Sequence, residues 1–214
     1  APRVIRQLQA GSCFINSYND APVEVPELGT IKVDISYGGM FYVIADGTQF
    51  GLRMTADEGR DIVRIGEMIK AATKEQLDCV HPDNPEVRGV TIAQLSAPPS
   101  GDHADRRNTV IVSTGELDWE RPSTWKGCLD RSPCGTGTCA RMAVMHAKGQ
   151  LGLNQDFRHE GILGTVFTGR LLRGHVADLA DRHAAARLHD VVGRLHEAEI
   201  ADLHCALVRE EHVL

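Results

Sequence analysis

The chain has 214 residues, of which 42% are hydrophobic and 24% charged, as is ordinary for a globular protein of one domain or one and a half. The formal net charge is −6 and no lysine- and arginine-rich run occurs, which argues against nucleic acid as a partner. No apolar run approaches the ~18 residues needed to cross a bilayer, so we expect no membrane contact. Residues 1–10 lack the apolar core of a secretory signal, and we expect a cytoplasmic protein.

The first half of the chain is expected to form strands and one helix. Residues 30–37 alternate apolar and polar side chains with the period of two that is typical of a half-buried strand. Gly38-Gly39 offers a two-residue hairpin turn, and residues 40–45 would form the return strand. The capping box at residues 55–58 then predicts the start of a helix that extends to about residue 72.

The second half mixes short strands with one further helix. Prolines punctuate a loop region, and we expect strands at residues 90–95 and 108–113, followed by a loop over residues 119–124. A helix is predicted from Gly135 to Lys148, since apolar residues follow at the i, i+3, i+4, i+7 spacing of a buried face. A final strand is expected over residues 165–171.

Residues 130–139, Asp-Arg-Ser-Pro-Cys-Gly-Thr-Gly-Thr-Cys, carry most of the information about chemistry. Cys134 directly precedes the predicted helix. The partial positive charge and the free backbone N–H groups of a helix N-terminus favour a thiolate and can also hold an anion. A carboxylate-bearing substrate bound by those N–H groups would therefore lie within reach of the Cys134 sulfur. The alternative is a buried structural cysteine at the start of a helix.

This segment resembles the second catalytic-cysteine motif of the proline racemase and hydroxyproline epimerase family. Residues 34–44, 107–110 and 159–169 resemble further family segments in the same order, so that the resemblance covers about residues 21–170. It implies an α+β fold like that of diaminopimelate epimerase, which has two halves, each a β-sheet wrapped around a central helix, and an active site between them. One half would be mostly present in this chain and the other largely missing.

The resemblance also implies a racemase or epimerase that needs no cofactor and acts on proline or a hydroxyproline. Two cysteines would flank the substrate Cα, one removing a proton as a thiolate and the other returning one to the opposite face. Cys134 would be one of these groups. Gly135 and Thr136 would bind the substrate carboxylate through their N–H groups, and Asp130 would bind the ring nitrogen; the alternative for Asp130 is an Asx turn before the helix.

Two further residues are candidates for substrate contact. His103 and Asp105 shortly precede Arg107-Asn108, where some family members place a histidine that contacts the substrate. Of the two, the resemblance places Asp105 at that position. The alternative for both residues is a solvated loop.

The first catalytic-cysteine motif of the family, a Cys-Gly-His turn, does not occur in this sequence. We therefore expect that the chain is a fragment and that its own activity is incomplete. A second hypothesis is a dehydratase of trans-3-hydroxyproline, although those relatives typically carry threonine at the position of Cys134. A third hypothesis is that the chain is half of such a protein and has no catalytic activity. A homodimer is also possible, because a second subunit would supply another base.

The two ends of the chain match the family poorly. Residues 1–20 show little resemblance, and residues 171–214 contain no aromatic, Pro, Ser, Thr, Asn, Gln or Lys residue but six of the ten histidines. Such depletion is typical of a shifted reading frame in a GC-rich gene. A divergent helical tail is the alternative, and the sequence leaves both open.

The cysteines do not indicate a disulfide framework or a metal centre. Six cysteines at irregular spacing in a chain of this length are better interpreted as reduced thiols. Cys128, Cys134 and Cys139 lie near one another but form no Cys-x-x-Cys pair, and the tail histidines are not spaced at i, i+4. The Gly-Thr-Gly-Thr run lacks the Gly-Lys-Ser/Thr of a nucleotide phosphate loop. We therefore expect no metal and no cofactor, and a small cyclic amino acid as the ligand.

Overall fold

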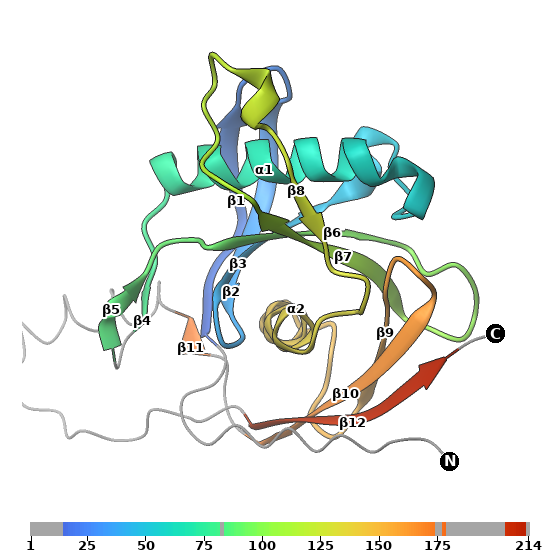
Figure 1. The fold of residues 1–214 in the computed structure, drawn as a ribbon. Helices are drawn as coiled ribbons and strands as arrows, with labels where there is room; N and C mark the ends of the chain where they lie inside the picture. The colour runs from blue at the N-terminus through green and yellow to red at the C-terminus, as the bar shows by residue number, and fades with distance from the viewer. Residues whose placement is uncertain (1–14, 82–83, 174–176, 179–203, 213–214) are drawn as a thin grey trace, which may run out of the picture.

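The computed structural model describes residues 15–81, 84–173, 177–178 and 204–212 of the chain. A ten-stranded mixed sheet dominates these residues and curls around helix α2, while helix α1 lies across its other face (Figure 1). This arrangement confirms the expected α+β class and the expectation of strands around a central helix. No helix of the described residues is long and apolar enough to cross a membrane.

The path through the sheet joins strands that are distant in the sequence. In spatial order it comprises β11 (Ala177–Asp178), β1 (Ile15–Val25), β2 (Gly29–Tyr37), β3 (Phe41–Asp46), β6 (Ile92–Ala97), β7 (Arg106–Ser113), β9 (Asp156–Glu160), β10 (Thr165–Arg173) and β12 (His204–His212). The pairs β11–β1, β3–β6 and β7–β9 are parallel, and the other neighbours are antiparallel.

Smaller elements complete the described structure. Strand β8 (Gly127–Leu129) pairs with β7 beside the main path, and β4 (Val80–His81) pairs with β5 (Asn84–Arg88) in a separate small sheet. The helices are α1 (Gly59–Gln76) and α2 (Gly135–Ala147), with short 3-10 turns η1 (Gly47–Phe50), η2 (Ala56–Glu58) and η3 (Pro122–Thr124). The last of these turns lies inside the predicted loop.

The hairpin of β2 and β3 confirms the prediction from the period of two. The strands pair from Val33 opposite Ala45 to Tyr37 opposite Phe41, so the turn has three residues, Gly38 to Met40, and the expected two-residue turn is wrong by one residue. Because alternate side chains of a strand point to opposite faces, Phe41, Val43 and Ala45 join the apolar core beneath α1. Tyr42 and Ile44 instead pack toward α2.

Helix α1 begins where the capping box predicted it, after a turn of 3-10 helix. The Glu58 carboxylate accepts hydrogen bonds from the backbone N–H groups of Thr55 (3.0 Å) and Arg53 (2.9 Å). The helix then continues to Gln76, beyond the predicted end near residue 72. Its buried face carries Ile62, Ile65 and Ile69, and it packs on the sheet in the largest apolar cluster of the described residues.

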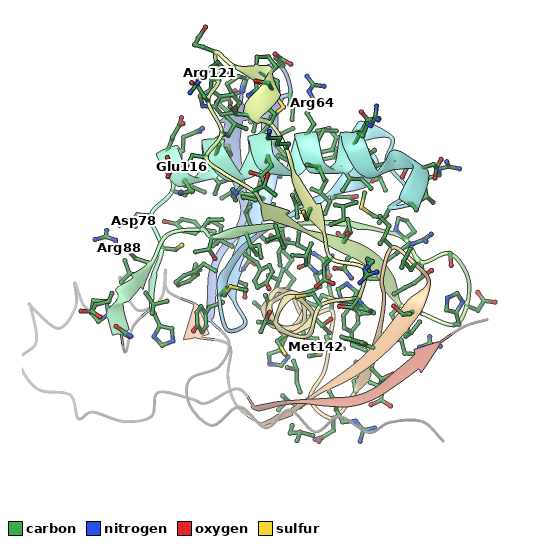
Figure 2. All side chains as sticks on the ribbon, viewed as in Figure 1. Arg64, Asp78, Arg88, Glu116, Arg121 and Met142 are labelled. Atoms are coloured by element: carbon green, nitrogen blue, oxygen red, sulfur yellow. The ribbon has the colours of Figure 1, made fainter. Side chains whose placement is uncertain are left out.

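Helix α2 occupies the centre of the curled sheet and has nearly the predicted bounds. One side of it, with Ala140 and Val144, packs against Tyr42, Ile44, Ile92 and Val110. The other side packs toward β9 and β10 through Met142, Phe157 and Leu171. Figure 2 shows that side chains fill the space between α2 and these strands, with Met142 among them.

The described parts of the tail are strands. Strand β12 pairs antiparallel with β10 from Thr165 opposite His212 to Arg173 opposite His204, and β11 pairs with β1. The helical alternative is therefore wrong for these two segments, because main-chain pairing with the open edges of β10 and of β1 decides their conformation. Residues 179–203 and 1–14 lie outside the described residues. Strand β1 begins at Ile15, inside the N-terminal segment that shows little resemblance.

Candidate active site

Cys134 is the N-cap residue of α2, which confirms its predicted place at the helix N-terminus. Its side chain is half-buried, and its Sγ accepts a hydrogen bond from the Gly137 N–H at 3.4 Å. The backbone at Cys134 has φ 63° and ψ 120°, a conformation that residues with a side chain rarely adopt. Such strain persists only where the surrounding structure fixes it, and it is common at functional sites.

The loop before the helix holds Cys134 through Asp130 and Ser132. Oδ1 of Asp130 accepts hydrogen bonds from the N–H and the hydroxyl of Ser132, both at 2.9 Å. The Ser132 Oγ in turn accepts from the Cys134 N–H at 3.1 Å. Asp130 therefore forms the Asx turn expected as the alternative to substrate binding. Its Oδ2 has no hydrogen-bond partner within the described residues, so this oxygen can still meet a ligand.

Tyr42 completes the immediate surroundings of the thiol, and sequence reasoning missed it. The hydroxyl lies 2.7 Å from Thr136 Oγ1 and 3.5 Å from Cys134 Sγ. Burial, and next the negative charge at Cys134, raise the pKa of Tyr42 far above its usual value, so the phenol stays neutral. The period of two along β3 was a usable signal, because it directs Tyr42 into the core, where a phenol needs a polar partner.

Asn108 holds the loop that precedes Cys134 in place through hydrogen bonds. This fully buried side chain donates from Nδ2 to the carbonyl oxygens of Pro133 (3.3 Å) and Glu160 (3.1 Å). Its Oδ1 accepts from Gln94 Nε2 at 2.8 Å. One amide thus ties β6, β7 and β9 to the residue that precedes Cys134.

His159 and Thr138 form a second buried contact under the first turn of α2. The Thr138 hydroxyl lies 2.9 Å from His159 Nδ1 and donates to the Pro133 carbonyl at 3.3 Å. Burial lowers the pKa of His159 well below its usual value, and the charges of Arg141 and Arg106 lower it further. The imidazole is therefore neutral.

The tip of the β2–β3 hairpin lies directly against α2. A Cβ atom at Gly38 would lie 2.5 Å from the Ala140 backbone nitrogen and would also collide with the Thr136 carbonyl oxygen. A side chain is therefore excluded at Gly38, because backbone atoms cannot move aside as a flexible side chain can. This close contact sets the position of Tyr42 against the first turn of α2.

The structure brings four of the predicted site residues together and leaves two apart. Asp130, Cys134, Gly135 and Thr136 lie in one loop and helix start. His103 lies with its Nε2 3.8 Å from the Glu160 carboxylate. Asp105 forms an ion pair with Arg158 at 2.7 Å. Partial burial alone would raise the pKa of Asp105, but the hydrogen bonds and the charge of Arg158 lower it. Neither side chain contacts Cys134.

Metal ligands do not gather at this site. Within the part of the chain that the structure describes, no group of three His, Cys, Asp or Glu side chains is placed to hold a metal ion. In the same residues, Cys79, Cys128, Cys134 and Cys139 form no disulfide bond.

Comparison with known proteins gives the family. The model of the proline racemase family matches residues 7–203, and the chain belongs to this family. The match extends beyond residues 21–170, where the sequence resemblance was recognised. It includes residues of both ends of the chain that had shown little resemblance.

Individual relatives include enzymes with related names. The chain is 33% identical over 150 residues to a proline racemase of Clostridioides difficile, covering 70% of this chain and 41% of the relative. It is 38% identical over 161 residues to a probable 4-hydroxyproline 2-epimerase of Rhizobium meliloti, covering 75% and 44%. The chain thus spans less than half the length of these curated relatives.

A solved structure shows the same likeness. A hydroxyproline epimerase from Agrobacterium vitis with bound trans-4-hydroxy-L-proline matches with a TM-score of 0.68 and 27% identity. The match covers 92% of this chain and 47% of the epimerase.

Proposed function

We propose that this chain carries one of the two acid/base groups of a racemase or epimerase of proline or hydroxyproline that uses no cofactor. The observation that carries the proposal is the position of Cys134, which is half-buried at the N-cap of α2 with its sulfur accepting from the Gly137 N–H. A thiol so placed is suited to general acid–base work. The relatives named as proline racemase and hydroxyproline epimerase support the substrate class.

The proposed chemistry assigns a role to each neighbouring group. The N–H groups of Gly135 and Thr136 belong to the first turn of a helix, where backbone N–H groups lack intrahelical partners, and they would hold the substrate carboxylate. The free Oδ2 of Asp130 would accept from the ring ammonium. Tyr42, held neutral, would orient the Cys134 sulfur through its hydroxyl.

The proton transfer itself uses the sulfur of Cys134. The thiolate takes the proton from Cα, so that the Cα–H bond breaks, an S–H bond forms, and the electron pair is delocalised into the bound carboxylate. Return of the same proton regenerates the starting isomer. Inversion requires that a second acid deliver a proton to the opposite face of Cα.

We propose that this polypeptide alone is incomplete as a catalyst, because its sequence lacks the motif that carries the second acid in the family. Gly-His occurs once in the sequence, at residues 174–175, and it follows Arg173 instead of a cysteine or serine. The expected diaminopimelate epimerase-like pairing of two halves would place the other acid/base group across the substrate from Cys134. Loss of one positioned acid or base typically costs ~10²–10⁴-fold in rate.

The test is to follow exchange and inversion at Cα separately. Purified protein is incubated in D₂O with L-proline or trans-4-hydroxy-L-proline; NMR reports deuterium at Cα, and chiral chromatography reports the isomer. We expect slow exchange without inversion, and Cys134→Ser should lower that exchange by at least ~10²-fold. Cys128→Ser, at an exposed thiol, is the matched control and should leave exchange unchanged.

Two results would contradict parts of this proposal. Inversion at an enzymatic rate that Cys134→Ser abolishes would show that a second base is present, for example from a second copy of the chain. Absence of both exchange and binding would favour the reading of a half without catalysis.

Loss of water from trans-3-hydroxyproline is the competing reaction. The cysteine at position 134 favours proton exchange over this dehydration. The same assay run with trans-3-hydroxy-L-proline would reveal an unsaturated product if dehydration were the real activity.

A further inference from the structure

A polar cavity of about 470 Å³ lies beside the C-terminal half of α2, away from Cys134. The middle of β1 and of β2, the ends of β3 and β6, the start of β7, and the middle of α2 with the residues just after it contribute its lining. Four of the lining residues are basic (Lys32, Arg106, Arg141 and Lys148), and three are acidic (Asp20, Asp34 and Asp46). This volume falls within the ~300–1,000 Å³ that is common for small-molecule sites.

The three carboxylates of the cavity already have partners. Lys148 Nζ lies 2.6 Å from an oxygen of Asp34 and 3.0 Å from an oxygen of Asp20. The Asp46 Oδ1 accepts hydrogen bonds from the N–H (2.9 Å) and the hydroxyl (2.7 Å) of Thr48. One lysine therefore serves two carboxylates, and the third carboxylate caps a 3-10 turn.

The remaining basic groups of the cavity are poorly neutralised. Arg141 reaches Asp34 only at 3.8 Å, and its buried Nε has no hydrogen-bond partner in the described residues. Arg106 donates to the Asp105 carbonyl at 3.0 Å, but within the same residues neither it nor Lys32 forms an ion pair. Burial lowers the pKa of Arg141; the charges of Asp34 and Asp46 oppose this shift, and the charge of Arg106 adds to it, so the two guanidinium groups lie close enough to repel.

We propose that this cavity is a binding site for a small oxyanion, either a phosphate or a dicarboxylate, bridging Arg106 and Arg141 with Lys32 at the rim. Guanidinium groups bind carboxylate and phosphate oxygens through paired, charge-assisted hydrogen bonds. A bound anion would remove the repulsion between the two arginines and satisfy the buried Nε–H of Arg141.

The proposed anion site is separate from the candidate active site. Arg141 follows Cys134 by seven residues along the chain and helix, which corresponds to ~10 Å. An apolar cluster lies between α2 and the sheet and contacts Cys134 at one end. It consists of Tyr42, Ile44, Ile92, Val110, Ala140 and Val144. Ile44 also lines the cavity, so this cluster separates the two sites. The inference thus stands apart from the function proposed for Cys134.

The experiment is calorimetric titration of the purified chain with inorganic phosphate and, separately, with succinate at constant ionic strength in a chloride buffer. We expect saturable binding of at least one anion, and the two titrations distinguish phosphate from dicarboxylate. Arg106→Met and Arg141→Met should each weaken it by at least about tenfold, the loss expected for one charge-assisted contact. Arg60→Met is the matched control, because Arg60 is exposed and lacks a partner within the described residues.

Lys32→Met keeps the test decisive if an arginine variant does not fold, because Lys32 is exposed and its replacement should be tolerated. We expect it to weaken binding less than Arg106→Met does. The proposal is overturned if neither anion binds saturably, or if binding survives in all three cavity variants. It is also overturned if trans-4-hydroxy-L-proline competes with the anion or Cys134→Ser abolishes anion binding, since the anion would then occupy the active site.

Discussion

The two faces of the main sheet bury different kinds of side chain. Beneath α1, apolar side chains from β1, β2, β3, β6 and the helix form one large continuous cluster. Toward α2, the apolar residues form two smaller clusters, and buried polar side chains lie among and beside them: Gln94, Asn108, Thr138, His159 and Glu160. The first face is mainly apolar, although α1 also buries the ion pair of Glu67 and Lys70 (2.9 Å). On the second face, hydrogen bonds between buried side chains and the backbone hold one loop and one thiol in place.

A single strand serves both faces. Along β3, Phe41 and Val43 enter the α1 cluster, whereas Tyr42 contacts Cys134 and Thr136. Stability and site geometry are therefore encoded at alternate positions of the same strand. A substitution on one face should change one property more than the other, and this expectation can be tested.

The largest effect on stability is expected beneath α1. Ile69→Ala removes a side chain that is 1% exposed and should lower the free energy of unfolding by about 2–5 kcal/mol. Urea denaturation followed by circular dichroism measures this loss. The alkylation rate of Cys134 in the folded protein, read by peptide mass spectrometry, should stay unchanged. Val112→Ala, at a side chain that is 43% exposed, is the control and should change stability by less than about 0.5 kcal/mol.

Asn108→Leu, on the α2 face, is expected to lower stability less than Ile69→Ala does and to change the alkylation rate of Cys134. It removes the Nδ2 donor from the carbonyl oxygens of Pro133 and Glu160 and the Oδ1 acceptor from the Gln94 amide, which should cost about 1–3 kcal/mol, while Pro133 keeps its hydrogen bond from Thr138. The Cys134 loop should open more often, so the alkylation rate of Cys134 rises. Asn19→Leu, at an exposed position of β1 where the side chain makes no hydrogen bond within the described residues, should change neither quantity. An unchanged alkylation rate in Asn108→Leu would mean that the amide does not control the loop.

His159 should make the α2 face sensitive to pH. Because its pKa in the folded protein lies well below the usual 6.5, the unfolded chain takes up a proton first as pH falls. Stability is thus full above pH ~6.5 and falls below it, by at most about 1.4 kcal/mol per pH unit for this one group, until the folded pKa is reached. Urea denaturation from pH 7.5 to 5 should show a shallower slope in His159→Asn. Equal slopes in the two proteins would rule out this assignment.

The smallest effect is expected for Tyr42→Phe. Loss of the hydroxyl contact to Thr136 should cost about 0.5–1.5 kcal/mol, and the alkylation rate of Cys134 should change. Since its raised pKa keeps Tyr42 protonated, the cost should be the same at pH 7 and pH 9. Tyr18→Phe removes a hydroxyl that donates to the Asp78 carbonyl at 2.8 Å beside the α1 cluster. It should leave Cys134 unaffected, and a shift there would show that the faces are coupled.

The local patterns of the sequence predicted the elements that place Cys134. The apolar spacing after Gly135 gave helix α2, and the period of two gave the hairpin of β2 and β3. Both signals are local, because each depends on residues that are neighbours on one element. The short strands β8 and β9 were missed, since β8 has three residues and β9, Asp-Phe-Arg-His-Glu, is mostly polar in sequence.

The rest of the site could not be read from local patterns. Asn108 contacts Pro133 and Glu160, residues 25 and 52 positions away in the chain, and Tyr42 contacts Thr136 across 94 positions. These contacts depend on the order of the strands around α2, which periodicity does not specify. The family resemblance supplied Asp130, Gly135 and Thr136, but it gave no indication of the polar network behind them.

The backbone conformation at Cys134 has a practical consequence for anyone who wants to trap a ligand. Its φ of 63° is one that glycine adopts freely and alanine does not. Conformations of this kind cost other residues about 1–3 kcal/mol. Cys134→Gly should therefore give a protein without this thiol that melts at a higher temperature than Cys134→Ala. The glycine variant is the better starting material for crystals of a complex with a ligand.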